Sequence, residues 1–149
     1  MFTLRGRGIR ASIDVLGPSV WIHVEGSVEE KWCREEGDEV LRMLRQLRQA
    51  HAKPDLYIIT PFVMVADRLR QTIRESDVLK GWGGEDEWRW INERIGTVHT
   101  AQGREAEAVI LVLGGSSPGT NWCAQLGWWT AEFVECGCDS REGSHVCRW

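Results

Sequence analysis

A chain of 149 residues can form one domain with an ordinary core but is too short for two domains of typical size. Its net charge of −4 argues against a freestanding polyelectrolyte binder with a basic surface, so any contact with nucleic acid has to be local. No segment resembles a signal peptide or approaches the roughly 20 apolar residues of a membrane span, so we expect a cytoplasmic protein without a membrane partner.

The first element expected in chain order is a strand that follows an irregular lead-in over residues 1–18. The lead-in contains three arginines, three glycines and Pro18, a composition typical of loops. From Val20 to Glu25 the side chains alternate between two faces. One face carries Val20, Ile22 and Val24, and the other carries Trp21, His23 and Glu25. This alternation predicts a strand.

A helix, a strand and a second helix are expected next. From Glu35 the apolar residues recur at helical spacing, and arginines occupy the opposite face. The inward residues are Val40, Met43 or Leu44, and Leu47, and the outward residues are Arg42, Arg45 and Arg48. Pro54 and Asp55 break the chain before Leu56–Thr60, an apolar run that suits a strand buried on both faces of a parallel sheet. The following helix would turn Ala66, Leu69 and Ile73 inward.

The segment 77–90 is expected to be a surface loop that passes into a short helix. It contains three glycines and several acidic residues, which favour a loop. The short helix carries Trp88 and Ile91 at helical spacing, so both side chains are expected to pack into a core or an interface.

Two strands, 94–99 and 108–113, complete the pattern and are joined by a tight turn over 101–106. The expected order is strand, helix, strand, helix, strand, strand. This order predicts an α/β layer sandwich with a mainly parallel sheet and right-handed crossovers.

Two short segments at the ends of these strands resemble motifs of a known family. Residues 96–105 read Gly-Thr-Val-His-Thr-Ala-Gln-Gly-Arg-Glu, and residues 57–62 read Tyr-Ile-Ile-Thr-Pro-Phe. Together they resemble the second RecA-like domain of superfamily 1 DNA and RNA helicases, in the branch that includes the DNA-replication and nonsense-mediated-decay helicases. The resemblance covers residues 19–119 and implies a RecA-like, P-loop NTPase-like three-layer sandwich with a mainly parallel sheet.

The resemblance implies a role for each motif. The residues implied in contacts with the DNA or RNA backbone, without reading base sequence, are Thr60, Pro61, Thr97, His99 and Thr100. The residues implied in binding or sensing nucleotide, in the cleft between two lobes, are Gln102, Gly103, Arg104 and Glu105.

Simpler interpretations stay open for several of these residues. Thr60 and Pro61 also fit a helix N-cap followed by proline at the first helical position. Arg104 and Glu105 also fit a solvated ion pair in a polar turn, which would contribute little. Outside its motif His99 would be a packed or hydrogen-bonded histidine rather than a catalyst. The nine tryptophans are better explained by packing than by base stacking.

The sequence lacks the parts that hold triphosphate and metal. It contains neither a G-x-x-x-x-G-K-[ST] phosphate loop nor the acidic strand motif that binds magnesium. We therefore assign no catalytic residue and expect ATP and Mg²⁺ to bind only together with a missing N-terminal RecA-like lobe. The expected function is that of a truncated C-terminal lobe of an ATP-dependent helicase, inactive alone. The alternatives are a noncatalytic nucleic-acid-binding or regulatory module with the same fold, and a decayed gene product.

Residues 120–149 depart from the family pattern. The family continues into a strand and helix reading N-L-L-N-V-A-V-T-R-A, whose arginine reaches the γ-phosphate, whereas residues 131–141 here are unrelated to it. Codons for this segment, read one base later, can encode the family motif, which motivates the hypothesis of a frameshifted tail. Codons incompatible with the shifted frame would refute it.

The same tail carries four of the five cysteines, and Cys136, Cys138 and Cys147 are crowded toward its end. Cys136, Cys138, His145 and Cys147 are residue types that zinc accepts, but their C-x-C spacing is unlike the usual C-x₂₋₄-C pairs. An odd number of cysteines also argues against a disulfide framework. We therefore expect free thiols and assign no metal site.

Overall fold

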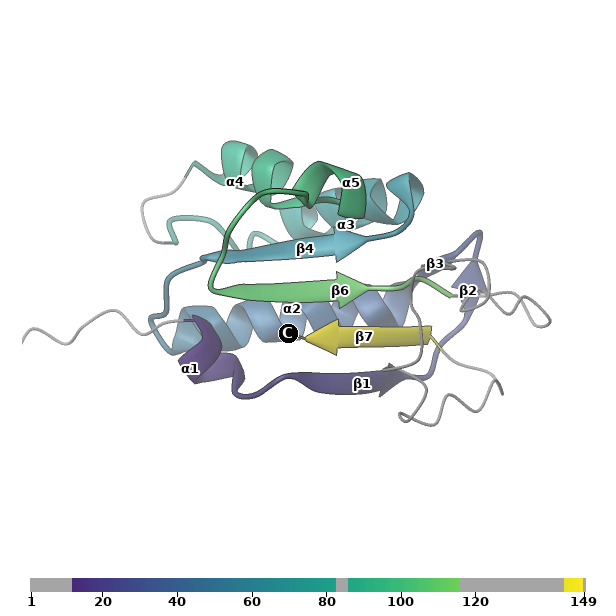
Figure 1. The fold of residues 1–149 in the computed structure, drawn as a ribbon, viewed down its shortest axis with the longest axis horizontal. Helices are drawn as coiled ribbons and strands as arrows, with labels where there is room; N and C mark the ends of the chain where they lie inside the picture. The colour runs from purple at the N-terminus through teal and green to yellow at the C-terminus, as the bar shows by residue number, and fades with distance from the viewer. Residues whose placement is uncertain (1–11, 83–85, 116–143, 149) are drawn as a thin grey trace, which may run out of the picture.

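A five-stranded sheet forms the centre of the computed structural model, which describes residues 12–82, 86–115 and 144–148 (Figure 1). The strands lie in the order β1-β7-β6-β4-β5. Their bounds are β1 Val20–Val24, β4 Leu56–Thr60, β5 Ile95–Thr97, β6 Ala108–Val112 and β7 Ser144–Arg148. Two short strands, β2 Val28–Glu29 and β3 Trp32–Cys33, form a separate hairpin.

All strands of the main sheet except β7 run in the same direction. β4 pairs in parallel with both β5 and β6. β7 pairs antiparallel with β1 and with β6, so β1 runs parallel to β6 although another strand separates them. The expected α/β fold with a mainly parallel sheet, as in RecA-like domains, is confirmed.

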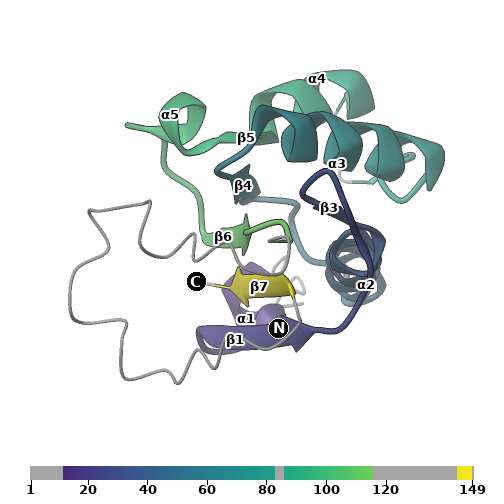
Figure 2. The same ribbon diagram turned by 90° about the vertical axis from the view of Figure 1, so that its right-hand side faces the viewer.

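The helices lie mostly on one side of this sheet. The described helices are α1 Ser12–Leu16, α2 Arg34–Gln49, α3 Val63–Glu75, α4 Glu87–Arg94 and α5 Val98–Ala101. α2 and α3 cover one face, and α4 packs on α3 beside the edge strand β5 (Figure 2). Both long helices lie where the apolar spacing predicts them.

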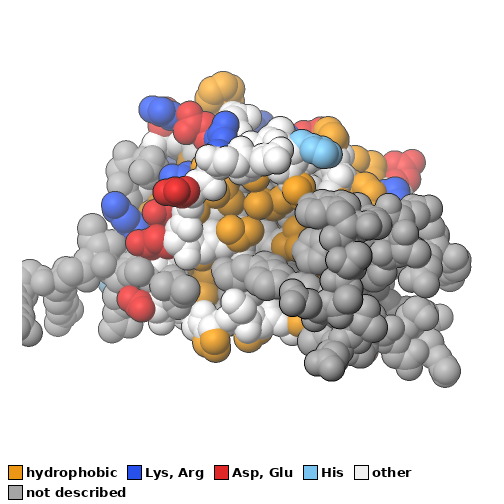
Figure 3. Space-filling view, viewed as in Figure 1, with side chains coloured by type: hydrophobic (Ala, Val, Ile, Leu, Met, Phe, Trp, Pro, Cys, Tyr) orange, Lys and Arg blue, Asp and Glu red, His pale blue; other side chains and the backbone are white. Residues whose placement is uncertain are grey.

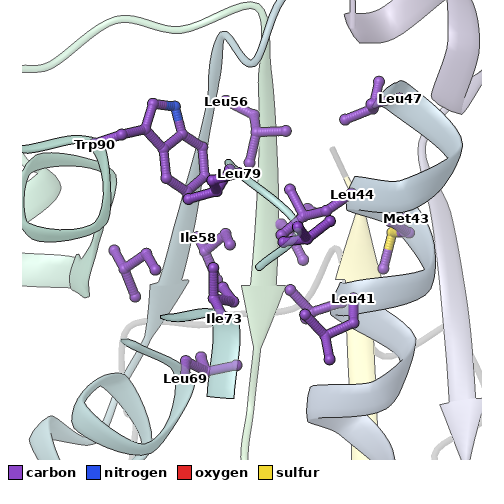
Figure 4. Close-up of a cluster of buried hydrophobic side chains, with 14 of the residues drawn as sticks. Leu41, Met43, Leu44, Leu47, Leu56, Ile58, Leu69, Ile73, Leu79 and Trp90 are labelled. Atoms are coloured by element: carbon purple, nitrogen blue, oxygen red, sulfur yellow. The ribbon is translucent and has the colours of Figure 1, made fainter. Parts of the chain in front are cut away.

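The main core lies between the sheet and these two helices (Figure 4). The sheet contributes Leu56 and Ile58 of β4 and Ile110 and Val112 of β6, all fully buried. The helices contribute Val40, Leu44 and Leu47 of α2 and Leu69 and Ile73 of α3. Alternate residues of a strand share a face, as do residues three or four apart on a helix, so these positions meet. Each buried aliphatic side chain stabilises the fold by about 1.5–3 kcal/mol.

The opposite face of the sheet is less buried than expected. Tyr57 and Ile59 of β4 are only half-buried, so the prediction of a strand buried on both faces is wrong. Trp21 and Ile59 pack there against Leu111 and Leu113, and Figure 3 shows hydrophobic side chains across the middle of this face. Since α2 and α3 both lie on the other side, the described ranges supply two of the three expected layers.

The expected irregular lead-in ends in a packed helix. α1 carries Leu16 into the core, where the side chain is buried. The Ser12 hydroxyl donates to the Lys53 carbonyl (2.7 Å), and the Ser12 amide donates to the Glu107 carboxylate (3.1 Å). A helix of five residues is too short to show an apolar period, which is why it was not predicted. Residues 1–11 lie outside the described residues.

The start of the predicted surface loop is also packed. Val78, Leu79 and Trp82 are buried in the main core. The Trp82 indole N–H donates to the Ala52 carbonyl (2.9 Å), which ties this segment to the connection between α2 and β4. In the sequence these apolar residues are interspersed with glycines and acidic residues, so no periodic apolar pattern predicts that they are buried.

The prediction for Trp88 in α4 is wrong. Ile91 is fully buried as expected, but Trp88 is 68% exposed. Trp90 is buried instead, and its indole N–H donates to the Pro54 carbonyl (2.8 Å). The helix starts after Asp86, whose carboxylate accepts a hydrogen bond from the Arg89 amide (2.9 Å). Because α4 starts after Asp86 and packs against α3, its buried face carries Trp90 rather than Trp88.

Among the described helices, none has the length and apolar character needed to span a membrane. The segment 120–149 is described only at β7, which lies between β1 and β6. Cys136, Cys138 and the residues of the frameshift hypothesis therefore lie outside the described ranges.

Candidate functional site

The two motifs meet at the carboxyl edge of the parallel strands. Thr60 is the last residue of β4 and Thr97 the last of β5, and the two are paired in the register of the sheet. In open α/β sheets this edge is the usual place for a ligand, because the strands end there in loops and helix N-termini. The fold thus brings together two segments that are far apart in the sequence.

Thr60 does not present its hydroxyl to solvent. Its side chain is fully buried, and Oγ1 accepts a hydrogen bond from the Phe62 amide (3.3 Å). α3 begins at Val63, with Phe62 as its N-cap residue and without a side-chain cap. The alternative N-cap interpretation is therefore wrong, because the helix starts later than the motif suggests. The expected phosphate contact of Thr60 stays a prediction, which the burial of its hydroxyl does not favour. Pro61 is half-buried, and the first amides of α3 remain as donors at this edge.

The second motif leaves the sheet as a helical turn. β5 ends at Thr97, which is the N-cap residue of α5 and makes no side-chain cap hydrogen bond. The Thr100 hydroxyl donates to the Thr97 carbonyl (2.8 Å). Thr97 is half-buried, whereas His99 and Thr100 are exposed, so His99 is not a packed histidine. The prediction of a strand that continues to His99 is wrong, because β5 ends at Thr97. Thr97, His99 and Thr100 nevertheless all lie at the start of α5, next to the carboxyl edge of the sheet.

Gly96 allows α5 to fold back closely on β5. A Cβ atom at this buried position would collide with the Thr100 hydroxyl oxygen. The oxygen is held there by its bond to the Thr97 carbonyl, so it cannot move away without losing that bond. The first residue of the motif therefore has a steric role.

The nucleotide-contacting residues expected at 102–105 form an exposed turn after α5. Gly103 has φ +79°, a conformation that glycine adopts without strain. The Arg104 amide donates to the Ala101 carbonyl (3.1 Å), and the Arg104 side chain donates from Nη1 to the Glu93 carbonyl at the end of α4 (3.0 Å). The ion pairs of the described residues do not join Arg104 to its acidic neighbour, so the geometry does not support the ion-pair interpretation.

A lysine that the sequence analysis missed lies beside the first motif. Lys31 Nζ lies 4.2 Å from the centre of the Phe62 ring, and the Lys31 carbonyl accepts a hydrogen bond from the Gly115 amide (2.9 Å). Glu30 and Lys31 have positive φ values of 48° and 79° in the turn between β2 and β3. Such turns are normally marked by asparagine or glycine, so this sequence carries no signal for the hairpin.

The β1 end of the same edge is acidic. Gly26 follows β1, and a Cβ atom there would collide with the Glu35 carboxylate at the start of α2. Hydrogen bonds from the Glu35 backbone amide and from the Cys33 thiol (3.3 Å) lower the pKa of this carboxyl. Because an ionised acid repels phosphate, the favourable part of the edge lies near β4 and β5.

A family model for the AAA domain matches residues 9–127, which is most of the chain. The chain belongs to this AAA-domain family. Its members form the C-terminal part of DNA2/NAM7-type superfamily 1 helicases, so the resemblance stated from the two motifs is confirmed. The protein is therefore a helicase-type, NTPase-like domain. Comparisons with curated proteins and with solved structures give no match.

In this helicase-type domain, Gly103→Ala is expected to lower the free energy of unfolding by about 1–2 kcal/mol. The cost arises from the backbone alone, because φ is +79° and no atom lies within 4 Å of the added Cβ. Gly81, with φ +68° and equally open space, offers a matched control outside the motifs, and Gly81→Ala should cost about the same. Urea denaturation measures both. A Gly103→Ala protein as stable as wild type would show that the turn is not left-handed.

Proposed function

We propose that this helicase-type domain is the C-terminal lobe of an ATP-driven motor, in which it grips the nucleic-acid backbone and forms one wall of the ATP cleft. The observation that carries the proposal is the convergence of both motifs at the carboxyl edge of β4 and β5. Thr97 supplies a hydroxyl donor near this edge, and Thr100 can supply a second when its hydroxyl turns from the Thr97 carbonyl to a phosphate. The first amides of α3 supply further donors. Small neutral donors suit phosphate groups without reading bases.

The nucleotide part of the proposal rests on the 102–105 turn. Gly103 leaves open space beside the backbone, so a ligand can approach it closely. Arg104 is anchored by one guanidinium nitrogen on the Glu93 carbonyl, and its other N–H groups can donate to an anion. In the described residues no three His, Cys, Asp or Glu side chains gather to hold a metal ion. We propose that the partner lobe supplies the ligands of Mg²⁺, because this sequence lacks the acidic strand motif that binds it, and we assign no catalytic step to this chain.

The purified chain is expected to hydrolyse ATP no faster than a protein-free control, with or without single-stranded DNA or RNA. The reason is that its sequence lacks the phosphate loop and the magnesium-binding acid on which phosphoryl transfer depends. Release of inorganic phosphate in excess ATP and Mg²⁺ measures this. Clear turnover by pure protein that Arg104→Ala or Glu105→Gln abolishes would contradict the proposed division of labour between two lobes.

Binding of the wild-type chain to labelled single-stranded DNA and RNA tests the proposed grip. The affinity is expected to fall as salt rises and to change little between oligonucleotides of equal length and different sequence, because the contacts are to phosphates. Fluorescence anisotropy over a range of salt concentrations measures both properties. A strong preference for one sequence would count against a backbone grip, and comparison of the DNA and RNA affinities shows which polymer is preferred.

A noncatalytic nucleic-acid-binding module is the second candidate. It is favoured by the hydroxyl groups of Thr97 and Thr100, whose proposed phosphate contacts do not require ATP. A neighbouring reading frame that encodes a phosphate loop would favour the motor. Its absence, together with measurable single-strand binding, would favour the module. The coding DNA of residues 131–141 also decides whether the tail is frameshifted.

A further inference from the structure

An arginine outside both motifs holds the strand that carries the second motif. Among the strands that the structure describes, β5 is at the end of the sheet and pairs with β4 alone, so no described strand lies on its outer side. Arg70 of α3 reaches this strand, and its Nη2 donates to the Ile95 carbonyl (2.6 Å). A side chain thus bonds to a main-chain group of the edge strand at the residue just before the motif.

The guanidinium of Arg70 is fixed by a second bond on its own helix. Nη1 donates to the Asp67 carboxylate (2.6 Å), one helical turn earlier. The third donor, Nε, is buried and has no hydrogen-bond partner in the described part of the chain. Leaving a buried donor unpaired costs free energy. The bonds to Ile95 and Asp67 are therefore the interactions that offset this cost, and only the bond to Ile95 reaches another element.

The bond lies at the point where α5 turns back onto β5. The next residue is Gly96, and a Cβ atom on it would lie 3.9 Å from Arg70 Nη2 and would collide with the Thr100 hydroxyl. Thr100 in turn donates to the Thr97 carbonyl (2.8 Å). An unbroken path of contacts thus runs from Arg70 through the β5 backbone to both threonine side chains.

We propose that Arg70 is a positioning residue that sets the location of Thr97 and Thr100. α3 starts directly after the Tyr57–Phe62 motif, so Arg70 also connects the two motifs through one rigid helix. Its effect on nucleic-acid binding rests on the proposed function, whereas its effect on the local structure of β5 and α5 does not. Lysine cannot replace it fully, because a single ammonium group lacks the planar fork that reaches both acceptors.

The test compares Arg70→Met and Arg70→Lys with Arg74→Met, which changes an exposed arginine on the same helix. Hydrogen exchange of the amides in 96–101 is the first measurement. It is expected to be about tenfold faster in Arg70→Met than in wild type, less affected in Arg70→Lys and unchanged in Arg74→Met. Amides of β6 serve as the internal reference. Should Arg70→Met not fold, Asp67→Asn, which weakens the anchor of Arg70, replaces it and should accelerate exchange in the same segment.

Salt-dependent binding of a single-stranded oligonucleotide is the second measurement. The affinity of Arg70→Met is expected to fall about fivefold with the slope of log K against log salt unchanged, because Arg70 itself touches no phosphate. A slope reduced by about 0.7 would mean a direct phosphate contact and would overturn the positioning role. Unchanged exchange in 96–101 would also overturn it. Faster local exchange without any oligonucleotide binding by wild type would support the positioning role and refute the proposed function.

Discussion

Replacing Trp90 with alanine is expected to lower the free energy of unfolding by about 3–5 kcal/mol. The indole is buried in the core near Leu56 and Leu79 (Figure 4), so its removal leaves a large cavity. Its N–H also donates to the Pro54 carbonyl (2.8 Å), which ties α4 to the segment before β4. The substitution therefore adds an unpaired buried carbonyl to the lost packing. Urea denaturation followed by circular dichroism measures the change.

Trp88→Ala provides the matched control for this prediction. Trp88 lies on the same helix but is 68% exposed, so its removal is expected to change stability by less than about 0.5 kcal/mol. Trp90→Phe should fall between the two, since it keeps an aromatic ring but loses the bond to Pro54. Equal losses for Trp88→Ala and Trp90→Ala would mean that α4 presents a different face to the core.

Replacing Gly96 with alanine is expected to destabilise the domain by about 1–3 kcal/mol and to weaken nucleic-acid binding. The added Cβ atom meets the Thr100 hydroxyl, which must then give up its bond to the Thr97 carbonyl. α5 would move away from β5, and the two threonines would no longer lie as they do here. Denaturation measures the first effect, and fluorescence anisotropy with a single-stranded oligonucleotide measures the second.

A second substitution separates this collision from a general effect of alanine in a strand. Thr100→Ala removes the oxygen that Gly96→Ala meets, so the stability loss in the double variant should be smaller than the sum of the two single losses. The double variant should still bind nucleic acid weakly, because one proposed donor is missing. If the two stability losses simply add, the close approach of α5 to Gly96 is not what makes glycine necessary.

Much of the fold follows from periodicity. The alternation in β1 and the apolar run of β4 predict these strands, although the run does not show which face of β4 is less buried. The helical spacing in α2 and α3 predicts which of their residues lie in the main core, because it is long enough to define a face. Trp88 was misplaced because α4 has eight residues and its start depends on the Asp86 side chain. α1 and the hairpin formed by β2 and β3 are too short to show a periodic pattern of apolar residues. Their positions depend on contacts with distant residues, such as Lys31 with Gly115.

The site was predictable at the level of the motifs but not of their geometry. The family model confirms the family that the two motifs resemble, and the parallel strand order brings the motifs together at one edge. The burial of Thr60 depends on where α3 starts, which the sequence leaves open. Arg70 was missed because its acceptor is a main-chain carbonyl on another element, and an arginine on a helix carries no sign of that partner. The roles of Gln102–Glu105 in nucleotide binding stay a prediction.

The most direct test of the central claim is the affinity of Thr97→Val for single-stranded nucleic acid. This substitution keeps the shape of a side chain whose hydroxyl does not cap α5, so the fold should be unaffected. The account predicts binding about fivefold weaker than wild type and a normal affinity for Thr72→Val, the same substitution on α3 outside both motifs. Thr97→Val that binds as tightly as wild type, measured by anisotropy at low salt, would contradict a backbone grip at the β4–β5 edge.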